Sequence, residues 1–342
     1  MEVIMENKQI VFTKINTAEL LDVEYVEPKA NEVVVKTEFS TISCGTERAN
    51  ITGDPNISGI GPSQVVFPRL LGYSNAGRIV AVGEGVKDLK VGDAVASIGG
   101  FHKKYNVFAQ QNVVKFDDTK IPMDIAAISY ISIFPIAAIR KTRLEMGEPA
   151  IVMGLGILGQ FAVKFLRAAG AYPVIAADPI EERRLEALRS GADYALNPLD
   201  EDFAKKVKEI TGGGVKVAIE VTGVGAGFDT VLDCMRPFGR VALLGCTRDK
   251  NFTIDYYKKI HFPGITIVGA HNNARPMHES SPGYFTMQDD MKTYHGLYAG
   301  GRINMDGFIK EVHSPVEAPE VYDRLVNDKH FPIVVQFDWS RL

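Results

Sequence analysis

The segment GLGILG (residues 154–159) decides the fold because of what lies on either side of it. The apolar run PAIVMG (149–154) indicates a short buried strand, and FAVKFLRAAG (161–170) has the apolar spacing of a helix. A second strand-like run, YPVIAAD (172–178), ends on Asp178, 19 residues after Gly159. A glycine-rich turn in this setting, with an acidic residue about 20 positions later, indicates a dinucleotide-binding unit.

The glycines allow backbone N–H groups at the start of a helix to approach a pyrophosphate, which a Cβ atom would obstruct. Asp178 is expected to accept the ribose hydroxyls of NAD and to repel the 2′-phosphate of NADP, so NAD is the predicted cofactor. Arg183 and Arg184 leave an alternative, because either residue can pair with a phosphate or lie on a solvated helix face. The predicted cofactor contacts in this region are Gly154, Gly156, Ile157, Leu158, Gly159, Asp178 and Arg183.

Strands and helices alternate from about 148 to 270, which predicts an α/β fold with a doubly wound parallel sheet. In such sheets, ligands bind outside the carboxyl ends of the strands. The residues that follow three of the expected strands are therefore also predicted to lie beside the cofactor. They are Thr222 and Gly223, Gly245 and Cys246, and Ala270 and His271, with a surface position as the alternative for His271.

The flanking segments differ from this central block. Residues 1–120 hold many β-branched strand candidates separated by glycine-bearing turns. Two capped helices are expected later, one starting at Thr286 with Asp289 in its first turn and one starting at Ser314. The predicted division is a catalytic domain from 1–122, a nucleotide-binding domain from 123–272, and a return to the catalytic domain over 273–342.

Composition limits the classes of function. The 342 residues carry a formal charge of −4, which gives no electrostatic reason to expect a nucleic acid or an anionic membrane as partner. The N-terminus lacks the layout of a signal peptide, and the longest apolar stretch (125–139) is too short for a bilayer, so a cytoplasmic protein is expected. The three cysteines include no Cys-x-x-Cys pair, which argues against a disulfide scaffold and a four-cysteine zinc lobe.

Five motifs together resemble the medium-chain dehydrogenase/reductase superfamily, the relatives of zinc alcohol dehydrogenases, over essentially the whole chain. They are GTE (45–47), AGRIVAVG (76–83), VGDAV (91–95), GLGILG (154–159) and IEVTG (219–223). The segments SCGTERA and GAHNNARPMHESSPGYFTMQDD are similar to a zinc-poor branch that includes bacteriochlorophyllide dehydrogenase-like and threonine dehydrogenase-like proteins. The resemblance implies a GroES-like catalytic domain, an inserted Rossmann domain, an active site in the cleft between them, and a homodimer formed through the strand near ITIVGA (265–270).

The resemblance also bears on metal binding. Cys44 matches one zinc ligand of the family, whereas Tyr73 and Ser74 occupy the positions of a His-Glu pair and Tyr130 occupies the remaining ligand position. One thiol and two phenols do not make a catalytic zinc site, so no metal is expected. His102 and His271 leave open that another ligand approaches Cys44. Otherwise Cys44 is expected beside the nicotinamide, with simple packing as the alternative.

Hydrogen bonds then have to replace the metal. Thr46 matches the family hydroxyl that contacts the substrate alcohol, and Tyr73 and Tyr130 place phenols in the former metal pocket. A phenol donates to a carbonyl oxygen and, if its pKa is lowered, accepts an alcohol proton. The predicted catalytic set is Thr46, Tyr73, Tyr130 and Cys44. Glu47 and Arg48 are expected to form an ion pair, and the polar loop 275–285, with Arg275, suits a hydroxylated substrate.

The predicted function is an NAD-dependent oxidoreductase that interconverts a secondary alcohol and a ketone on a polar small molecule, such as a sugar or a cyclitol, without zinc. A zinc-free quinone or enone reductase, which delivers hydride to a C=C bond, is the first alternative. A non-catalytic NAD-binding sensor is the second.

Overall fold

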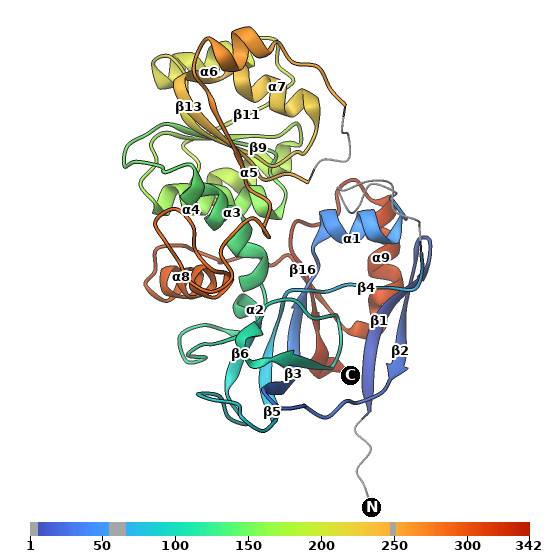
Figure 1. Ribbon diagram of the computed structural model, residues 1–342. Coiled ribbons are helices and arrows are strands. Elements are labelled where there is room, and N and C mark those ends of the chain that lie inside the picture. Colours follow the sequence, from blue (N-terminus) through green and yellow to red (C-terminus); the bar gives the residue numbers. More distant parts are fainter. Residues whose placement is uncertain (1–5, 55–65, 247–250) are drawn as a thin grey trace, which may run out of the picture. The chain divides into compact units, whose positions relative to one another are not determined.

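The computed structural model describes residues 6–54, 66–246 and 251–342, which fold into two compact units (Figure 1). The first unit comprises Met1–Ile131, Met291–Ala299 and Met305–Leu342, and the second comprises Ser132–Asp290 and Gly300–Asn304. Relative to the division expected from sequence, residues 123–131 fall in the first unit and residues 273–290 in the second. The predicted fold class, a sheet-rich unit and a parallel-sheet α/β unit, is confirmed.

The second unit contains a six-stranded parallel sheet with the order β11-β10-β9-β12-β13-β14. The strands are β9 (Ala150–Met153), β10 (Val174–Ala177), β11 (Tyr194–Leu196), β12 (Val215–Glu220), β13 (Met235–Leu243) and β14 (Thr266–Gly269). The chain starts at the centre with β9, winds outward to β11, and returns to continue on the other side with β12. The order therefore reverses between β9 and β12, where a doubly wound sheet opens a crevice at the carboxyl ends of its strands.

Helix α3 (Ser129–Lys141), which starts in the first unit, precedes β9. The helices between successive strands are α4 (Ile157–Ala168), α5 (Glu181–Arg189), α6 (Phe203–Thr211), α7 (Gly225–Asp233) and the π-helix η2 (Tyr257–His261). Buried side chains of the central strands, such as Ile151 and Val241, share one apolar cluster with Phe203 of α6 and Val231 of α7. This burial fixes the strand ends from which the glycine-rich turns project.

The first unit is built on a seven-stranded sheet with the order β15-β16-β3-β5-β6-β8, in which β7 also pairs with β3. Its strands are β3 (Glu32–Thr41), β5 (Asn75–Val82), β6 (Ala94–Ser97), β7 (Tyr105–Ala109), β8 (Val113–Lys115), β15 (Glu311–His313) and β16 (Val335–Asp338). Strand β16 pairs antiparallel with β3, so segments about 300 residues apart lie side by side (Figure 1). A smaller sheet has the order β2 (Thr17–Val23), β1 (Asn7–Lys14) and β4 (Arg69–Leu70).

Short helices complete the first unit. They are α1 (Cys44–Ile51), α2 (Met123–Ala126), α8 (Met287–Ala299, which starts in the second unit), α9 (Ala318–Asn327), and the 3-10 turns η1 (Gln110–Asn112), η3 (Pro315–Glu317) and η4 (Trp339–Arg341). Ile51 of α1 and Leu325 of α9 pack in one buried cluster with Phe12 and Trp339. In the part of the chain that the structure describes, no helix combines the length and apolar character needed to cross a membrane.

Both predicted helix starts carry caps. The backbone N–H of Asp289 donates to Thr286 Oγ1 at 3.2 Å, directly before α8. Ser314 forms a full capping box with Glu317, and its first turn is the 3-10 turn η3, which leads into α9. Sequence spacing therefore located these two helix starts correctly.

Candidate functional site

The glycine-rich turn of the second unit joins β9 to α4, and the structure gives a steric reason for Gly154 and for Gly159. Gly154 has a φ of +94°, a left-handed conformation that suits glycine. A Cβ atom on Gly159 would lie 1.9 Å from the carbonyl oxygen of Gly154, so the turn and the helix touch backbone to backbone. A Cβ atom on Gly156 would meet nothing within 4 Å. The open space is thus at Gly156, the N-cap of α4, where unpaired N–H groups of the first turn favour an anion.

Asp178 follows β10 and is almost fully buried beside this turn. Its Oδ2 accepts a hydrogen bond from the N–H of Leu155 at 2.8 Å, and its Oδ1 accepts one from the N–H of Ile180 at 2.8 Å. The guanidinium of Arg183 lies 3.7 Å from Oδ2. Each carboxylate oxygen has a further lone pair, so Asp178 both fixes the glycine turn and retains acceptor capacity for ribose hydroxyls.

Glu220, at the end of β12, organises the next turn, and sequence reasoning missed it. Its Oε1 accepts from the N–H of Thr222 at 2.8 Å and from the Thr222 hydroxyl, and both carboxylate oxygens accept from the N–H of Gly223 at 3.2 Å. Burial raises the pKa of this carboxyl, while these donors oppose the shift. The signal was present in IEVTG, because an acidic residue two positions before a threonine at a strand end can accept from the turn that follows.

The remaining predicted cofactor neighbours lie at the same carboxyl edge of the sheet. Gly245 approaches Gly223 so closely that a Cβ atom on it would lie 2.4 Å from the Gly223 nitrogen. Cys246, which comes next, is exposed. Ala270 is buried and donates its N–H to Leu243 O at 3.1 Å, whereas His271 is exposed and its Nδ1 accepts from the N–H of Asn273 at 3.2 Å.

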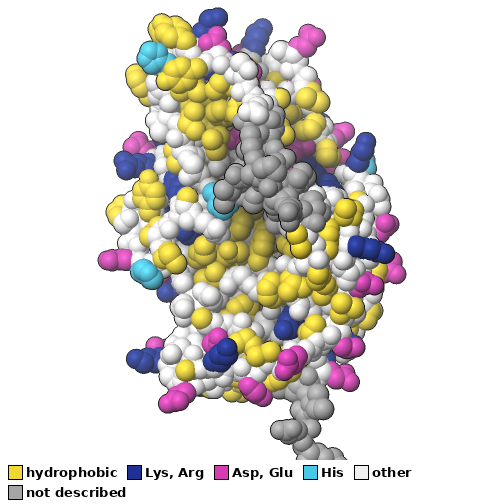
Figure 2. Space-filling model, turned by 45° about the vertical axis from the view of Figure 1, so that its right-hand side comes forward, with side chains coloured by type: hydrophobic (Ala, Val, Ile, Leu, Met, Phe, Trp, Pro, Cys, Tyr) yellow, Lys and Arg dark blue, Asp and Glu magenta, His cyan; other side chains and the backbone are white. Residues whose placement is uncertain are grey.

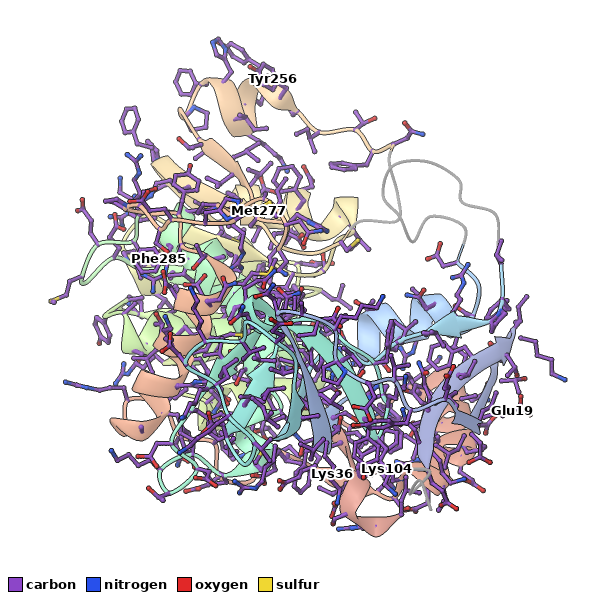
Figure 3. The ribbon with its side chains drawn as sticks, turned by 60° about the horizontal axis from the view of Figure 1, so that its bottom comes forward. Glu19, Lys36, Lys104, Tyr256, Met277 and Phe285 are labelled. Atoms are coloured by element: carbon purple, nitrogen blue, oxygen red, sulfur yellow. The ribbon has the colours of Figure 1, made fainter. Side chains whose placement is uncertain are left out.

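The loop after β14 is anchored by Arg275, which the sequence had suggested for substrate binding. The Arg275 side chain is 3% exposed, and its guanidinium pairs with the fully buried Asp290 at 2.9 Å, while Arg140 pairs with the other Asp290 oxygen at 2.8 Å. The Arg140 guanidinium also stacks 3.7 Å above the ring of Phe285, whereas Met277 of the same loop is 80% exposed (Figure 3). Arg275 is therefore committed to holding the loop in place, and a role in substrate binding is not supported.

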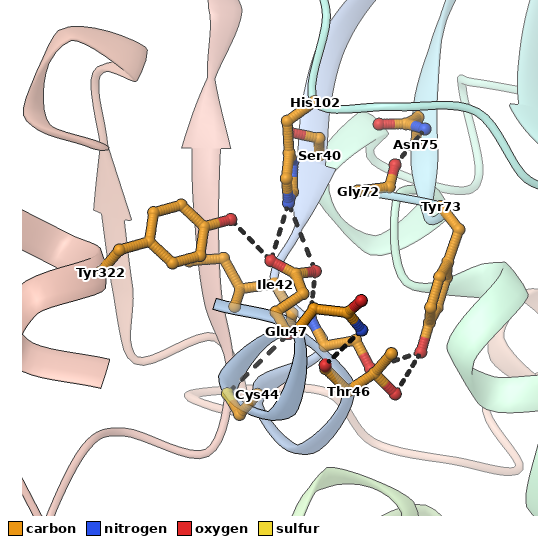
Figure 4. Close-up of polar contacts among 12 residues, drawn as sticks. Ser40, Ile42, Cys44, Thr46, Glu47, Gly72, Tyr73, Asn75, His102 and Tyr322 are labelled. Atoms are coloured by element: carbon orange, nitrogen blue, oxygen red, sulfur yellow. Dashed lines mark hydrogen bonds and ion pairs between the residues drawn. The ribbon is translucent and has the colours of Figure 1, made fainter. Parts of the chain in front are cut away.

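A buried carboxylate in the first unit anchors the start of α1 (Figure 4). Glu47 is fully buried and accepts from the N–H of Ser43 at 2.8 Å, from Tyr322 OH at 2.6 Å and from His102 Nε2 at 3.2 Å. The expected Glu47–Arg48 ion pair was wrong, because Arg48 Nε instead donates to the carbonyl oxygen of Leu325 at 2.7 Å. These partners come from separate segments of the chain, so no sequence spacing could have indicated the cluster.

The imidazole of His102 is held on both sides. Its Nδ1 lies 2.7 Å from Ser40 Oγ, which also accepts from the indole N–H of Trp339 at 2.8 Å. Its Nε2 faces the Glu47 carboxylate and therefore carries a proton. His102 is thus engaged in the Glu47 cluster rather than available as a metal ligand beside Cys44.

Three hydroxyl groups meet beside the first turn of α1. The hydroxyls of Ser43 and Tyr73 are in hydrogen-bond contact, and Tyr73 OH donates to Thr46 Oγ1 at 3.4 Å. The ring of Tyr130 packs edge-on against that of Tyr73, with 5.4 Å between centroids. The structure therefore brings together three of the four predicted catalytic residues and adds Ser43, which sequence reasoning missed.

Burial sets the protonation state of this cluster. Loss of hydration raises the pKa of Tyr73 to about 12, although the hydrogen bonds with Ser43 and Thr46 pull in the opposite direction. The phenol is consequently protonated at neutral pH and acts as a hydrogen-bond donor. The alternative in which a lowered pKa makes Tyr73 a proton acceptor is not supported.

Cys44, the fourth predicted catalytic residue, contacts the interior of the first unit. Its Sγ lies 3.8 Å from the carbonyl oxygens of Pro332 and Ile333, and the side chain packs against the apolar cluster that contains Trp339. Figure 4 shows Cys44 on one side of α1 and Tyr73 on the other. This environment agrees with a packing role.

The donor set does not fit a catalytic zinc ion. Such an ion needs about three nitrogen, sulfur or carboxylate ligands, and the family positions hold Cys44, Tyr73 and Tyr130. Within residues 6–54, 66–246 and 251–342, no three His, Cys, Asp or Glu side chains are grouped to hold a metal. The neutral phenol of Tyr73, whose pKa is raised by burial, is a poor substitute for these ligands.

Comparison with known proteins identifies the family of this chain. The family described as alcohol dehydrogenase GroES-like domain matches residues 29–118, and the family described as zinc-binding dehydrogenase matches residues 158–283. L-threonine 3-dehydrogenase from Pyrococcus horikoshii is 31% identical over 285 residues, which cover 74% of this chain and 79% of the relative. D-guloside 3-dehydrogenase from Escherichia coli is 28% identical, with 94% and 97% of the two chains covered. The chain therefore belongs to the zinc-type medium-chain dehydrogenase/reductase superfamily, and it is an enzyme of the medium-chain alcohol dehydrogenase type.

Solved structures share the fold over nearly the whole chain. A dehydrogenase from Escherichia coli, solved with NADH, has a TM-score of 0.82 at 19% identity and covers 98% of this chain and 99% of its own. A protein described as a putative zinc-binding dehydrogenase from Sinorhizobium meliloti, solved with NADP, has a TM-score of 0.80 at 20% identity, with the same coverage of both chains. At these identities the likeness establishes the fold alone.

Proposed function

We propose that this enzyme interconverts a secondary alcohol and a ketone on a polar small molecule, such as a sugar or a cyclitol, with NAD and without a catalytic metal ion. The observation that carries the proposal is the contact of the Ser43 and Thr46 hydroxyls with Tyr73, a phenol at a position where the family resemblance implies a metal ligand. The names of two relatives support the substrate class, because L-threonine and D-guloside are both polar, hydroxylated molecules.

The second unit supplies the cofactor site. The open space at Gly156 and the N–H groups of Ile157 and Leu158 in the first turn of α4 suit a pyrophosphate. Asp178 is positioned to accept ribose hydroxyls and to disfavour a 2′-phosphate, which supports NAD over NADP. When bound, the nicotinamide supplies the hydride chemistry.

The first unit manages the substrate oxygen and its proton. Tyr73 keeps its phenolic proton and donates it in a hydrogen bond to Thr46 Oγ1, so the hydroxyl hydrogen of Thr46 can be donated to a ketone oxygen that gains negative charge during reduction. Thr46, which is partly exposed, extends the same group of hydroxyls and is the group that contacts the substrate oxygen. In the oxidative direction the alcohol proton would pass through the partly exposed Thr46 hydroxyl to solvent water, while Tyr73 keeps its own proton.

Turnover assays test this function directly. Purified protein, with its zinc content measured by mass spectrometry, is assayed with NAD⁺ on a panel of polyols, sugars and cyclitols, and with NADH on quinones and enones. We expect alcohol oxidation that persists after dialysis against a chelator. Preference for quinones favours the C=C reductase, and tight NAD binding without turnover on either panel favours a sensor. Stoichiometric zinc whose removal abolishes activity contradicts the metal-free mechanism.

The cofactor assignment has its own test in Asp178→Ala. Loss of the carboxylate removes both the ribose acceptor and the charge that repels a 2′-phosphate, so NAD⁺ affinity should fall about tenfold or more while NADP⁺ affinity should rise. Calorimetric titration with both cofactors measures the change. Asp193→Ala, which removes a partly exposed carboxylate at the other end of β10, is the control. An unchanged NAD⁺/NADP⁺ ratio in Asp178→Ala contradicts the assignment.

We further propose that the enzyme is a homodimer that acts on a small-molecule substrate. Strand β14 is one of the two edges of the second unit's sheet, and its Thr266, Ile267 and Gly269 are exposed. Aromatic side chains are exposed nearby at Phe238 (73%) and Phe262 (78%). Figure 2 shows hydrophobic side chains gathered at the upper end of the molecule, over η2, which precedes β14. An exposed sheet edge flanked by apolar surface supports pairing with a second copy.

A further inference from the structure

Ser43 occupies the N-cap position of α1 but does not cap the helix with its side chain. Serine at an N-cap ordinarily accepts a hydrogen bond from a backbone N–H two or three residues later. Here the Ser43 hydroxyl contacts the hydroxyl of Tyr73 instead. The Ser43 hydroxyl therefore contacts the proposed catalytic group, Tyr73, instead of capping the helix.

Glu47 makes this arrangement possible. Its carboxylate accepts from the backbone N–H of Ser43 at 2.8 Å, so the start of α1 is held from the other side. The carboxylate itself is fixed by Tyr322 OH and His102 Nε2 in a fully buried site. The backbone of Ser43 therefore has a defined position that does not depend on its own hydroxyl.

The hydrogens available limit the directions in this group of hydroxyls. In the Ser43–Tyr73 contact either hydroxyl can be the donor, and a phenol has only one hydrogen. When that hydrogen of Tyr73 is directed to Thr46 Oγ1, which lies 3.4 Å away, Tyr73 is the acceptor and Ser43 the donor in their contact. A donor to the phenol oxygen lowers the pKa of Tyr73 and turns its proton away from Ser43.

We propose that Ser43 is a positioning residue for the reaction: its hydroxyl donates to Tyr73 and thereby directs the phenolic proton toward Thr46 and the substrate oxygen. This inference rests on the proposed function, since it assigns Tyr73 as the donor to Thr46 in that reaction. Ser43 acts through Tyr73 and has no direct contact with substrate in this scheme.

Kinetics of matched serine variants test the proposal. Ser43→Ala should lower kcat about tenfold, the factor that corresponds to about 1.4 kcal/mol in a barrier, with little change in NAD⁺ affinity or in the melting temperature. Ser43→Thr, which keeps the hydroxyl, should recover most of the activity. Ser314→Ala is the control, because Ser314 is a genuine cap, and it should lower the melting temperature without lowering kcat.

A double variant tests whether Ser43 acts through Tyr73 or affects the reaction independently of it. If Ser43 acts through Tyr73, then Ser43→Ala combined with Tyr73→Phe should have the kcat of Tyr73→Phe alone. Multiplicative losses in the double variant overturn the proposal, as does a kcat for Ser43→Ala within twofold of the wild type. A lowered melting temperature with unchanged kcat also overturns it, because that result identifies an ordinary cap.

A spectroscopic readout keeps this test separate from the proposed reaction. In protein labelled with fluorotyrosine, the resonance of Tyr73 is identified by its absence in Tyr73→Phe. It should shift in Ser43→Ala and return in Ser43→Thr, whether or not any alcohol is turned over. An unmoved resonance contradicts the Ser43–Tyr73 contact, whereas a shifted resonance without alcohol turnover shows that the proposed reaction has failed and the contact has not.

Discussion

Tyr73 shows at the scale of one residue how burial selects between two chemical roles. Sequence reasoning allowed this phenol to donate or to accept a proton. The structure raises its pKa to about 12, chiefly by removing water, and so leaves only the donor role at neutral pH. The choice depended on the local environment, which the residue's identity and position in the chain do not reveal.

The raised pKa of Tyr73 predicts a loss of stability in alkaline solution. An exposed tyrosine ionises near pH 10, so between about pH 10 and 12 the folded state holds a proton that the unfolded state has lost. The free energy of unfolding therefore falls as pH rises through this window, by on the order of 1–2 kcal/mol. In the Tyr73→Phe variant, which has no phenolic proton at this position, this part of the pH-dependent fall in the free energy of unfolding is absent.

Urea denaturation of wild type and Tyr73→Phe at pH 9 to 11.5 measures the effect. We expect the stability difference between the two proteins to shift in favour of the variant as pH rises. Tyr294 and Tyr322, whose pKa values are also raised by burial, are present in both proteins and cancel. A difference that stays constant with pH rules out the raised pKa of Tyr73.

Other single residues show the limits of sequence reasoning. Arg275 and Glu47 are polar residues near expected site positions, and both turned out to be engaged in buried structural contacts. Ser43 was missed for the opposite reason, because a serine before a short helix is most simply interpreted as a cap. Each outcome was decided by partners distant in sequence.

At the scale of elements, the turns after strands were better predicted than the side chains that hold them. The strand–turn–helix order around GLGILG and the caps at Thr286 and Ser314 depend on neighbours within a few residues. Local spacing therefore located them. Glu220 also acts locally, on Thr222 and Gly223, yet it was missed because a buried acid at a strand end was not expected.

Glu220→Ala should weaken NAD⁺ binding through the turn that follows β12. Its loss leaves the N–H groups of Thr222 and Gly223 without their acceptor, and the turn loses the shape that lets Gly245 approach Gly223. We expect NAD⁺ affinity to fall several-fold and unfolding free energy to fall by about 1–3 kcal/mol. Titration calorimetry and urea denaturation measure the two effects.

Glu209→Ala serves as the matched control, since Glu209 is a largely exposed glutamate on α6 with only a surface ion pair. It should change neither quantity appreciably. If Glu220→Ala binds NAD⁺ as tightly as this control, the turn does not contribute to the cofactor site.

At the scale of the whole molecule, the second unit was the more predictable of the two. Its strands are parallel and are joined by helices. The alternation of strand and helix segments along the sequence is therefore enough to predict a doubly wound parallel sheet. The first unit combines β3 with β16 and gathers Ser40, Glu47, His102, Tyr322 and Trp339 from five separate segments. Contacts between residues so far apart in the sequence produce no periodic pattern from which they could be predicted.

The proposed homodimer is tested by changing the exposed edge of the second unit. Ile267→Lys places a charge on β14, where charged side chains oppose edge-to-edge pairing. Light scattering coupled to gel filtration should give a dimer for the wild type and a monomer for the variant. Lys205→Glu, on the exposed face of α6, is the control and should remain dimeric. A monomeric wild type refutes the proposal.

The pairing of β16 with β3 imposes an order of events on a chain that is synthesised from its N-terminus. The second unit is almost one continuous stretch and can fold as soon as it leaves the ribosome. Strand β3 is synthesised long before its neighbour β16. Ser40 and His102 are likewise synthesised long before Trp339, whose indole N–H donates to Ser40. A nascent polypeptide with a folded second unit can therefore hold dinucleotide before it can act on an alcohol, because the first unit is complete only after β16 has been synthesised.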